Sequence, residues 1–352
     1  MLIVSNENRF FHLRSFSESL KKYNIDSKLI HDLDFTNRFL DFNINRRRRK
    51  DGNLKEILEE YKPDLVLLDR LSGVASEIIK RKIPYCILIR GNFWEESKWA
   101  KKTIYSSPIK KLSFFKNQRF AEMCFNNASL LLPISKYLEN VTKEKFPQKK
   151  IILFYADGRN PSEWKSTTVM KLKHPCVGLI QGMNVWGKTK EILTLTKVMN
   201  ELPNVTFYLA GDGIYENEII PKLKKFKNFI WLNKLEYPNE IKKFFSEIDI
   251  YLLLTGLEGL GQTIIEALLM KKLVIATNVG GVPELINNET GFLVKEKNHE
   301  EIIEKIKYSL DNPMEIANMK INGRKMMEEN FSWDEIAKKF KSIIDENFEN
   351  LK

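Results

Sequence analysis

The stretch "DIYLLLTGLEGLGQTIIEALLMKKLVIAT", residues 249–277, decides the fold. It starts with an apolar run, passes through a turn that contains three glycines, and continues as an apolar segment of helical length before a second apolar run. Both runs are apolar throughout rather than alternating, which is typical of parallel strands that are buried on both faces. A strand, a turn, a helix and a strand in this order predict a βαβ unit of an α/β sheet.

Similar apolar runs recur along the whole chain, and segments with helical periodicity lie between most of them. The runs are 2–5, 27–31, 64–69, 85–90, 129–135 and 150–156 in the first half, and 176–182, 205–211, 228–233, 249–255, 273–277 and 291–294 in the second. A polar stretch between residues 157 and 172 separates the two series. We therefore predict two tandem Rossmann-like domains, 1–165 and 166–335. Because ligands bind beyond the carboxyl ends of such strands, we expect an interdomain cleft where the two edges face each other.

The composition is that of a globular protein, with 352 residues, of which 43% are hydrophobic and 29% charged. Cys86, Cys124 and Cys176 are scattered, with no CxxC pair and no histidine at ligand spacing, which favours a reducing compartment and argues against a zinc site. The four histidines are widely spaced, and we expect no metal site. Since there is also no apolar run of membrane-spanning length and no signal peptide, we expect a cytoplasmic protein.

The net charge of +11 indicates an anionic partner, and two basic segments in the first half carry much of it. One is Arg46–Lys50. The other, Lys98–Arg119, has seven Lys or Arg, no acidic residue and several aromatic residues. Cations with exposed aromatics suit an anionic membrane surface, whereas the alternative is a solvated helical hairpin with its aromatics in the core. We see no nucleic-acid-binding motif and expect no nucleic-acid partner.

Two carboxylates, Glu258 and Glu266, stand out in the opening stretch. Glu258 lies in the glycine-rich turn, and Glu266 lies in a helix that is otherwise apolar apart from Gln262 and Thr263. The start of this helix, near Gly261, presents backbone N–H groups and the positive end of the helix dipole, which suits a phosphate. A buried carboxylate needs hydrogen-bond donors, and sugar hydroxyls are natural ones. The alternative is an exposed Glu266 on an amphipathic helix beside a plain turn, and the residues alone leave both interpretations open.

The stretch resembles the Glu-x7-Glu signature of the retaining glycosyltransferases of the GT-B fold, family 4, also called the group 1 transferases. The resemblance extends through "LVIATNVGGVPELI", "VGLIQGMNVWGKTKEI" and "ENFSWDEIAKKF", so it covers the C-terminal half almost end to end. The N-terminal half matches only coarsely, through "NASLLLPISKYL" and "FYADG".

This resemblance implies a donor site for a nucleotide-diphosphate sugar in the second domain. Glu258 would contact hydroxyls of the donor sugar, Glu266 would hold the ribose, and Lys188, with Lys190 as a reserve, would neutralise the diphosphate. The remaining donor-binding positions it implies are Gly182, Gly213, Gly259, Leu260, Gly261, Gln262 and Thr263.

The resemblance also implies transfer of a hexose-type sugar, with retention of configuration, to a hydroxyl of a glycan or a lipid-linked acceptor. It implies no cofactor and no metal. Similar proteins dock on membranes through the first domain, so docking of Lys98–Arg119 at the inner membrane face is a further expectation. The C-terminal helix, 336–352, would pack back on the first domain.

The sequence departs from the family pattern at three places. Met183 stands where an Arg is usual, Arg90 stands where many members have a His, and the segment after the first strand lacks glycine. Diphosphate neutralisation then falls on Lys188 together with Arg90, which we expect to be catalytic with Glu258, or the site is catalytically weak.

Two alternatives to an active transferase follow from the sequence. The departures allow a non-catalytic protein that binds nucleotide sugars. An NAD-dependent oxidoreductase would need a GxGxxG fingerprint, but after "AGDG" Glu216 replaces its third glycine. The base, the sugar, the acceptor and the oligomeric state do not follow from the sequence.

Overall fold

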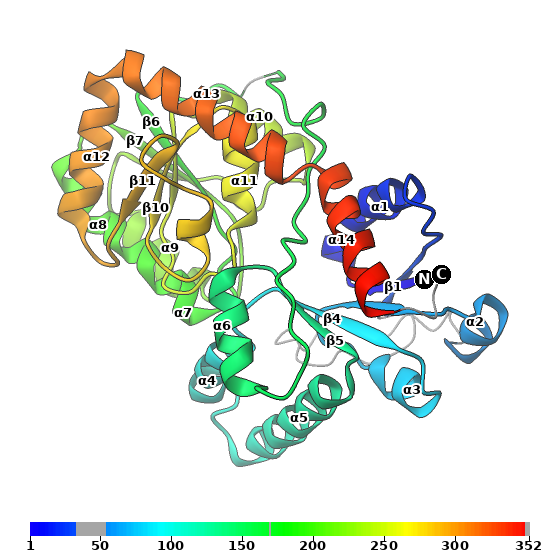
Figure 1. Ribbon diagram of the computed structural model, residues 1–352. Helices are drawn as coiled ribbons and strands as arrows, with labels where there is room; N and C mark the ends of the chain where they lie inside the picture. Colours follow the sequence, from blue (N-terminus) through cyan, green and yellow to red (C-terminus); the bar gives the residue numbers. More distant parts are fainter. Residues whose placement is uncertain (33–53, 169, 349–352) are drawn as a thin grey trace. The chain divides into compact units, whose positions relative to one another are not determined.

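The computed structural model describes residues 1–32, 54–168 and 170–348, so the basic run Arg46–Lys50 lies outside the described residues. The chain forms two compact units: unit 1 is Met1–Arg159 with Phe331–Lys352, and unit 2 is Asn160–Asn330. These divisions fall a few residues before the predicted ones at 165/166 and 335/336. Each unit has a parallel sheet with helices, which confirms the predicted α/β class with two Rossmann-like domains (Figure 1).

Unit 1 has a five-stranded sheet in the order β2-β1-β3-β4-β5, and all neighbouring strands are parallel. Its strands are β1 (Leu2–Ser5), β2 (Lys28–His31), β3 (Val66–Asp69), β4 (Tyr85–Ile89) and β5 (Leu130–Pro133). Its helices are α1 (Glu7–Lys21), α2 (Leu54–Tyr61), α3 (Ala75–Lys80), α4 (Phe93–Thr103), α5 (Pro108–Asn127), α6 (Lys136–Lys145) and α14 (Trp333–Asn347). The chain runs from β1 to the edge strand β2 and then crosses to β3 on the other side of β1, so the order reverses between β1 and β3.

One predicted strand of unit 1 is wrong. Residues 150–156 run beside β5 but form only an isolated bridge, Leu131 to Ile151. The ladder stops because the next residues along β5 include Pro133, which accepts a hydrogen bond from the Phe154 amide at 2.8 Å but has no N–H to donate in return.

Helix α14 completes the core of unit 1, although it follows unit 2 in the sequence. Its Phe340 contacts Phe16 of α1 and Phe154, with ring centroids 5.5 and 5.3 Å apart. Trp333, at the start of α14, lies 5.5 Å from the same Phe16 ring. All four aromatic side chains are buried, so the last helix closes an aromatic cluster whose other members lie before residue 155.

Unit 2 has a six-stranded parallel sheet in the order β11-β10-β9-β6-β7-β8. Its strands are β6 (Cys176–Ile180), β7 (Thr206–Ala210), β8 (Phe229–Trp231), β9 (Ile250–Leu253), β10 (Leu273–Thr277) and β11 (Gly291–Val294). Its helices are α7 (Trp186–Thr189), η2 (Lys190–Thr194), α8 (Leu195–Glu201), α9 (Glu216–Leu223), α10 (Asn239–Glu247), α11 (Gln262–Leu269), η3 (Val282–Glu284), α12 (His299–Asp311) and α13 (Pro313–Asn330).

The strand order of unit 2 reverses between β6 and β9. From β6 the chain builds outward through β7 to β8, then returns to the other side of β6 and builds outward again through β9 and β10 to β11. The opening stretch supplies β9, α11 and β10, so the predicted βαβ unit is confirmed at the centre of the sheet. Loops at such a reversal splay apart and leave room for a ligand beyond the carboxyl ends of the strands.

Within the described residues, no helix is both long enough and apolar enough to cross a lipid bilayer.

Candidate functional site

The loops that follow β6, β7, β9 and β10 meet at the carboxyl edge of the unit 2 sheet. The Gln181 amide donates to the Ala210 carbonyl at 2.9 Å, and the Met183 amide donates to Asp212 at 2.8 Å, which joins the first two loops. The Gly281 amide donates to the Glu258 carbonyl at 3.3 Å, which joins the other two. Backbone hydrogen bonds alone therefore join these four loops in two pairs.

Glu258 and Lys188 face each other across the reversal in strand order. Glu258 follows β9 and Lys188 lies in α7, which follows β6. The Lys188 Nζ atom is 3.7 Å from Glu258 Oε1, and the two side chains keep 24% and 21% of their surface exposed. Glu258 Oε1 also accepts the Gly259 amide at 3.0 Å, which orients the carboxylate. Two residues that are 70 positions apart in the sequence thus form one partly exposed pair of opposite charge.

Gly280 lets the loop after β10 approach the Glu258 backbone closely. It has a φ of +56°, and an added Cβ atom there would overlap the Glu258 carbonyl oxygen. Any other residue would be strained in conformation and would also displace the segment that carries Glu258.

Helix α11 begins directly after the glycine-rich turn. Gly261, its N-cap, has a φ of +105°, which glycine adopts readily. Gln262 and Thr263, which open the helix, are partly exposed, whereas Leu260 is buried. The helix begins four residues after Glu258, and the N–H groups of its first turn are of the kind that bind a phosphate at a helix N-terminus.

Glu266 is buried, with 2% of its surface exposed, in the second turn of α11. The Tyr237 hydroxyl, from the loop after β8, donates to Glu266 Oε1 at 3.0 Å. Thr263, one turn before Glu266 in the same helix, accepts a hydrogen bond at 2.5 Å from the Tyr251 hydroxyl of β9. The carboxylate is therefore not on a solvated helix face, which removes the alternative interpretation of this residue.

The other predicted donor-binding residues lie on the same edge. Gly182 is exposed, and the Gly213 amide donates to the Glu216 carboxylate at 3.2 Å. Lys190 begins η2, two residues beyond Lys188. Met183, which replaces the usual Arg, has a fully buried side chain in the core of unit 2. Met183 therefore adds apolar packing and no charge to this edge.

Arg90 is not placed as we expected from the sequence. It follows β4 in unit 1, and its side chain is 2% exposed, between Asp69 and Asp157. Its Nε atom donates to Asp69 Oδ1, and its Nη1 atom donates to Asp157 Oδ1 at 2.6 Å. Two carboxylates already neutralise this guanidinium, so the structure gives no support to Arg90 as a catalytic cation.

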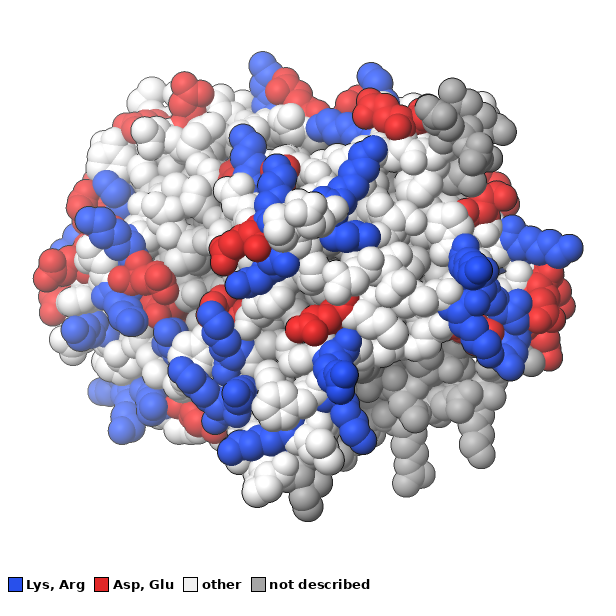
Figure 2. All heavy atoms as spheres, turned by 60° about the horizontal axis from the view of Figure 1, so that its bottom comes forward, with Lys and Arg blue, Asp and Glu red and all other residues white. Residues whose placement is uncertain are grey.

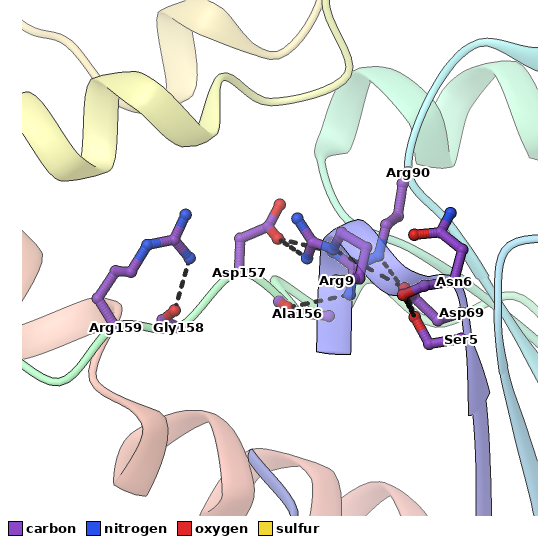
Figure 3. Close-up of polar contacts among 9 residues, drawn as sticks. All are labelled: Ser5, Asn6, Arg9, Asp69, Arg90, Ala156, Asp157, Gly158 and Arg159. Atoms are coloured by element: carbon purple, nitrogen blue, oxygen red, sulfur yellow. Dashed lines mark hydrogen bonds and ion pairs between the residues drawn. The ribbon is translucent and has the colours of Figure 1, made fainter. Parts of the chain in front are cut away.

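Arg9 completes this buried network in unit 1. Its Nη2 atom donates to Asp157 Oδ1 at 2.7 Å, and its Nε atom lies 3.8 Å from Asp69 Oδ2. The Ser5 hydroxyl adds a bond to Asp69 Oδ2 at 2.8 Å. Figure 3 shows the two arginines lying between the two aspartates. The network occupies the reversal between β1 and β3, because Ser5 ends β1 and Asp69 ends β3.

The pKa values of this network follow from burial and from its own charges. Burial raises the pKa of Asp69, but Arg90 and Arg9 outweigh it and leave the pKa below its usual value. The same balance, with Arg159 added, lowers the pKa of Asp157 further. Burial, and then the charge of Arg90, lowers the pKa of Arg9 to about 10. Burial, and then Arg159, holds the pKa of His12 well below 6.5, so this histidine is neutral.

Sequence reasoning missed two residues at the unit 2 edge. Tyr237 belongs to no motif and lies 29 residues before Glu266, so only its position after a strand could have indicated it. Glu191, three residues after Lys188, is the second residue. It is 2% exposed, and its Oε2 accepts the Lys297 amide at 3.1 Å.

Comparison with known proteins gives this edge a context. Residues 183–326 match the family model Glycosyl transferases group 1. The matched segment begins at Met183 and contains Lys188, Glu258 and Glu266. A relative in Methanocaldococcus jannaschii, named an uncharacterized glycosyltransferase, is 23% identical, and the match covers 96% of this chain and 90% of the relative's chain. The trehalose synthase of Pyrococcus horikoshii is 26% identical over 48% of this chain, and the match spans 45% of that enzyme.

Solved structures show the same fold over nearly the whole chain. Sucrose-phosphate synthase from Thermosynechococcus elongatus has a TM-score of 0.77, with 15% identity and 99% of each chain covered. Anabaena HepE in complex with UDP and glucose has a TM-score of 0.70, with 15% identity and 98% of each chain covered. These neighbours confirm the predicted GT-B class of fold. The family match and the glycosyltransferase relatives indicate a transferase.

Proposed function

We propose that this protein is a retaining glycosyltransferase that moves a hexose-type sugar from a nucleotide-diphosphate sugar to an acceptor hydroxyl. The observation that carries the proposal is the pairing of Lys188 with Glu258 at the reversal in strand order of unit 2, beside the N-terminus of α11. Carboxylate, ammonium and helix N-terminus are the groups that a sugar joined to a diphosphate needs. That HepE was solved with UDP and glucose supports a nucleotide sugar as the donor.

Each group has a distinct role in the proposed reaction. When the bond between the sugar and the diphosphate breaks, negative charge builds up on the departing phosphate. Lys188 and the first-turn N–H groups of α11 stabilise this charge in place, and the step as proposed requires no metal and no cofactor. Glu258, held by the Gly259 amide, accepts hydrogen bonds from sugar hydroxyls and orients the ring.

Glu266 would bind the ribose of the nucleotide. A carboxylate can accept about four hydrogen bonds, which suits the adjacent hydroxyls of a ribose, and the Tyr237 hydroxyl is one donor to it in this structure. Tyr237 holds the carboxylate in one orientation, and burial strengthens each hydrogen bond that the carboxylate makes.

A donor-binding screen tests the proposal. We expect one of the UDP-, GDP-, ADP- or dTDP-sugars to raise the melting temperature of the full chain, and Glu258→Gln and Lys188→Ala to reduce that shift. Lys197→Ala, a lysine exposed on α8, is the matched control and should bind as the wild type does. If no nucleotide sugar stabilises the protein, the assignment of Glu258, Lys188 and Glu266 is wrong.

A second assay separates transfer from binding alone. A non-catalytic nucleotide-sugar-binding protein is the rival, and buried Met183 and neutralised Arg90 favour it because neither brings a charge to a diphosphate. Hydrolysis or transfer of the bound donor, followed by nuclear magnetic resonance, measures both turnover and the configuration of the product. Retained configuration supports the proposal, whereas a tightly bound donor with no turnover supports the rival.

We also propose that the surface of α4 and α5 docks unit 1 on an anionic membrane that carries a lipid-linked acceptor. Leu112 and Phe115 of α5 are 61% and 53% exposed, among the basic residues of Lys98–Arg119. Phe114, by contrast, is buried beneath Lys101, so only part of the aromatic set faces solvent. On the face shown in Figure 2, many Lys and Arg side chains lie among uncharged ones, with several Asp and Glu side chains between them.

Vesicle sedimentation tests this docking. The protein should bind vesicles that contain phosphatidylglycerol and not vesicles of phosphatidylcholine alone, and salt should weaken the binding. Since each basic residue near such a surface contributes about 1 kcal/mol, Lys110→Glu with Lys111→Glu should release the protein. Lys222→Glu with Lys225→Glu, in unit 2, is the charge-matched control. Equal release by both pairs would contradict this surface.

A further inference from the structure

His174, Cys176 and Asp249 meet at the edge of the unit 2 sheet where β6 and β9 begin. Cys176 is the first residue of β6, and Asp249 directly precedes β9, the strand paired beside it. The His174 Nδ1 atom lies 2.8 Å from Asp249 Oδ2 and 3.6 Å from Cys176 Sγ. All three ligand atoms lie within 4.8 Å of one another.

We propose that these three side chains form a binding site for a divalent ion of the zinc class. A thiolate, an imidazole nitrogen and a carboxylate oxygen are the ligands that zinc takes in proteins, at distances of about 2.0–2.3 Å. Atoms that share one tetrahedral ion at such distances lie about 3.5 Å apart. The histidine nitrogen and the cysteine sulfur, at 3.6 Å, match this spacing, whereas the histidine nitrogen and Asp249 Oδ2, at 2.8 Å, would move apart slightly to admit the ion. Three protein ligands leave a fourth position for water.

The surroundings of His174 add an independent argument. Its second ring nitrogen, Nε2, lies 2.9 Å from Glu247 Oε1 at the end of α10. Metal-binding histidines commonly donate their remaining ring N–H to a carboxylate, which fixes the tautomer and turns the other nitrogen towards the metal. Both ring nitrogens face a carboxylate in this structure, Nε2 that of Glu247 and Nδ1 that of Asp249, so Nδ1 would give up its proton to an incoming ion while Glu247 keeps the proton on Nε2.

The site combines a fixed inner side with an open outer one. Cys176 is 1% exposed, and its backbone N–H donates to Asp249 Oδ2 at 2.8 Å, which holds the two strand ends together. The side chains of His174 and Asp249 are 42% and 38% exposed, so an ion can enter from solvent. The nearby Lys272 directs its ammonium at the Ser246 and Ile248 carbonyls, at 3.0 and 2.9 Å.

Binding here would tie the segment that enters unit 2 to the centre of its sheet. The site lies at the amino ends of the strands, whereas Lys188 and Glu258 lie at the carboxyl ends. It is therefore a structural or regulatory site that does not depend on the proposed transfer, and its test can succeed or fail separately.

The experiment uses the full chain after treatment with a chelator, with Zn²⁺ or Co²⁺ as the probe. We expect one equivalent of Zn²⁺ to bind and to raise the melting temperature. Co²⁺ should give the absorption of tetrahedral cobalt together with a thiolate-to-cobalt charge-transfer band. Cys176→Ser should abolish that band, and Glu247→Gln should weaken binding by roughly 10–100-fold through loss of the partner of His174.

Matched controls come from the other cysteines. Cys86→Ser and Cys124→Ser change buried thiols of unit 1 and should leave the cobalt spectrum unchanged. The proposal is overturned if the wild-type protein shows no charge-transfer band. It is also overturned if Cys176→Ser, folded by circular dichroism, binds Zn²⁺ as tightly as the wild type. Should Cys176→Ser not fold, the wild-type spectrum and Glu247→Gln decide.

Discussion

In the described part of the chain, the strand order of each unit reverses at one point, and charged residues occupy the two points in different ways. In unit 1, Arg9 and Arg90 lie between Asp69 and Asp157, and the side chains of all four are at most 7% exposed. In unit 2, Lys188 and Glu258 are 3.7 Å apart and keep about a fifth or more of their surface exposed. The same location in an α/β fold therefore holds a self-neutralising network in one unit and a looser pair in the other.

The comparison teaches that position at a sheet edge does not by itself make a charged residue a ligand group. The charge of a buried arginine that donates to two carboxylates is already neutralised by groups of the protein itself. A lysine and a glutamate at 3.7 Å, partly hydrated, interact weakly with each other, so a ligand can exchange for that contact at small cost. This difference predicts that substitutions in the buried network of unit 1 act on stability, whereas substitutions of Lys188 and Glu258 act on ligand binding.

Arg90→Met should have the largest effect, and the effect should be on the stability of unit 1. Removing one member of a buried ion network leaves charge uncompensated and costs about 3–5 kcal/mol. We expect Cys86 and Cys124 to react with a thiol reagent much faster in this variant, while Cys176 of unit 2 reacts at the wild-type rate. Peptide mass spectrometry of the labelled protein measures the three rates separately.

Arg81→Met is the matched control for this prediction. It makes the same substitution in unit 1, but Arg81 is partly exposed and pairs with Glu59 and Glu77 on the surface. Labelling of Cys86 and Cys124 should change little. If Arg90→Met behaves as Arg81→Met does, the buried network does not stabilise unit 1 and the comparison fails.

Lys188→Ala should have the next largest effect, and it should be on turnover rather than on stability. Loss of one group that stabilises developing charge typically costs 10²–10³-fold in kcat, or about 2.7–4 kcal/mol. Donor turnover at saturation, measured beside the Lys197→Ala control, checks this, and the urea midpoint should stay near that of the wild type. A variant with full turnover and lowered stability would reverse the assignment of the pair.

Gly280→Ala should lower stability and weaken donor binding together. The residue must adopt a φ of +56°, and its Cβ would overlap the Glu258 carbonyl oxygen, so a strain of about 1–3 kcal/mol is expected. Urea unfolding measures the first effect and the donor-induced rise in melting temperature measures the second. Gly182→Ala is the stability control, because a Cβ there meets only Asn184 Nδ2, at 3.8 Å.

The smallest predicted effect concerns the pH dependence of unit 1. Burial lowers the pKa of His12 well below 6.5, so below pH 6.5 the unfolded chain takes up a proton that the folded protein does not. Stability from this residue is therefore complete above pH 6.5 and falls as the pH drops, by about 1.4 kcal/mol per pH unit. His12→Gln should reduce this slope in urea unfolding measured on both sides of pH 6.5. An unchanged slope would show that His12 does not remain neutral in the fold.

Most of the fold could be predicted because parallel strands that are buried on both faces leave a strong pattern of uniformly apolar runs. The run 150–156 has the same pattern, but its partner strand includes Pro133, and the pairing partner of a run is not visible in its own composition. The donor-site edge could be predicted because glycines and carboxylates stand at strand ends, and a resemblance gave them roles.

The remaining parts depend on contacts between residues that are distant in sequence. Arg90 was expected to be a catalytic cation because it follows a strand. The sequence does not show that Asp69 and Asp157 lie beside it and neutralise its charge. In the same way, His174 and Cys176 form no zinc motif by themselves, because Asp249 joins them from 73 residues away. Strand ends can be located from sequence, whereas the side chains that meet there are set by the order of strands in the sheet.

The return of α14 to unit 1 has a consequence for biosynthesis. A ribosome releases every strand of unit 1 before unit 2, yet Phe16 and Phe154 meet Phe340 only after the whole of unit 2 has emerged. Unit 2 can therefore complete its fold before unit 1 does, and until α14 is made the aromatic side chains of unit 1 that pack against it stay exposed. Nascent chains stalled before residue 331 should for that reason recruit chaperones at the first unit and not at the second.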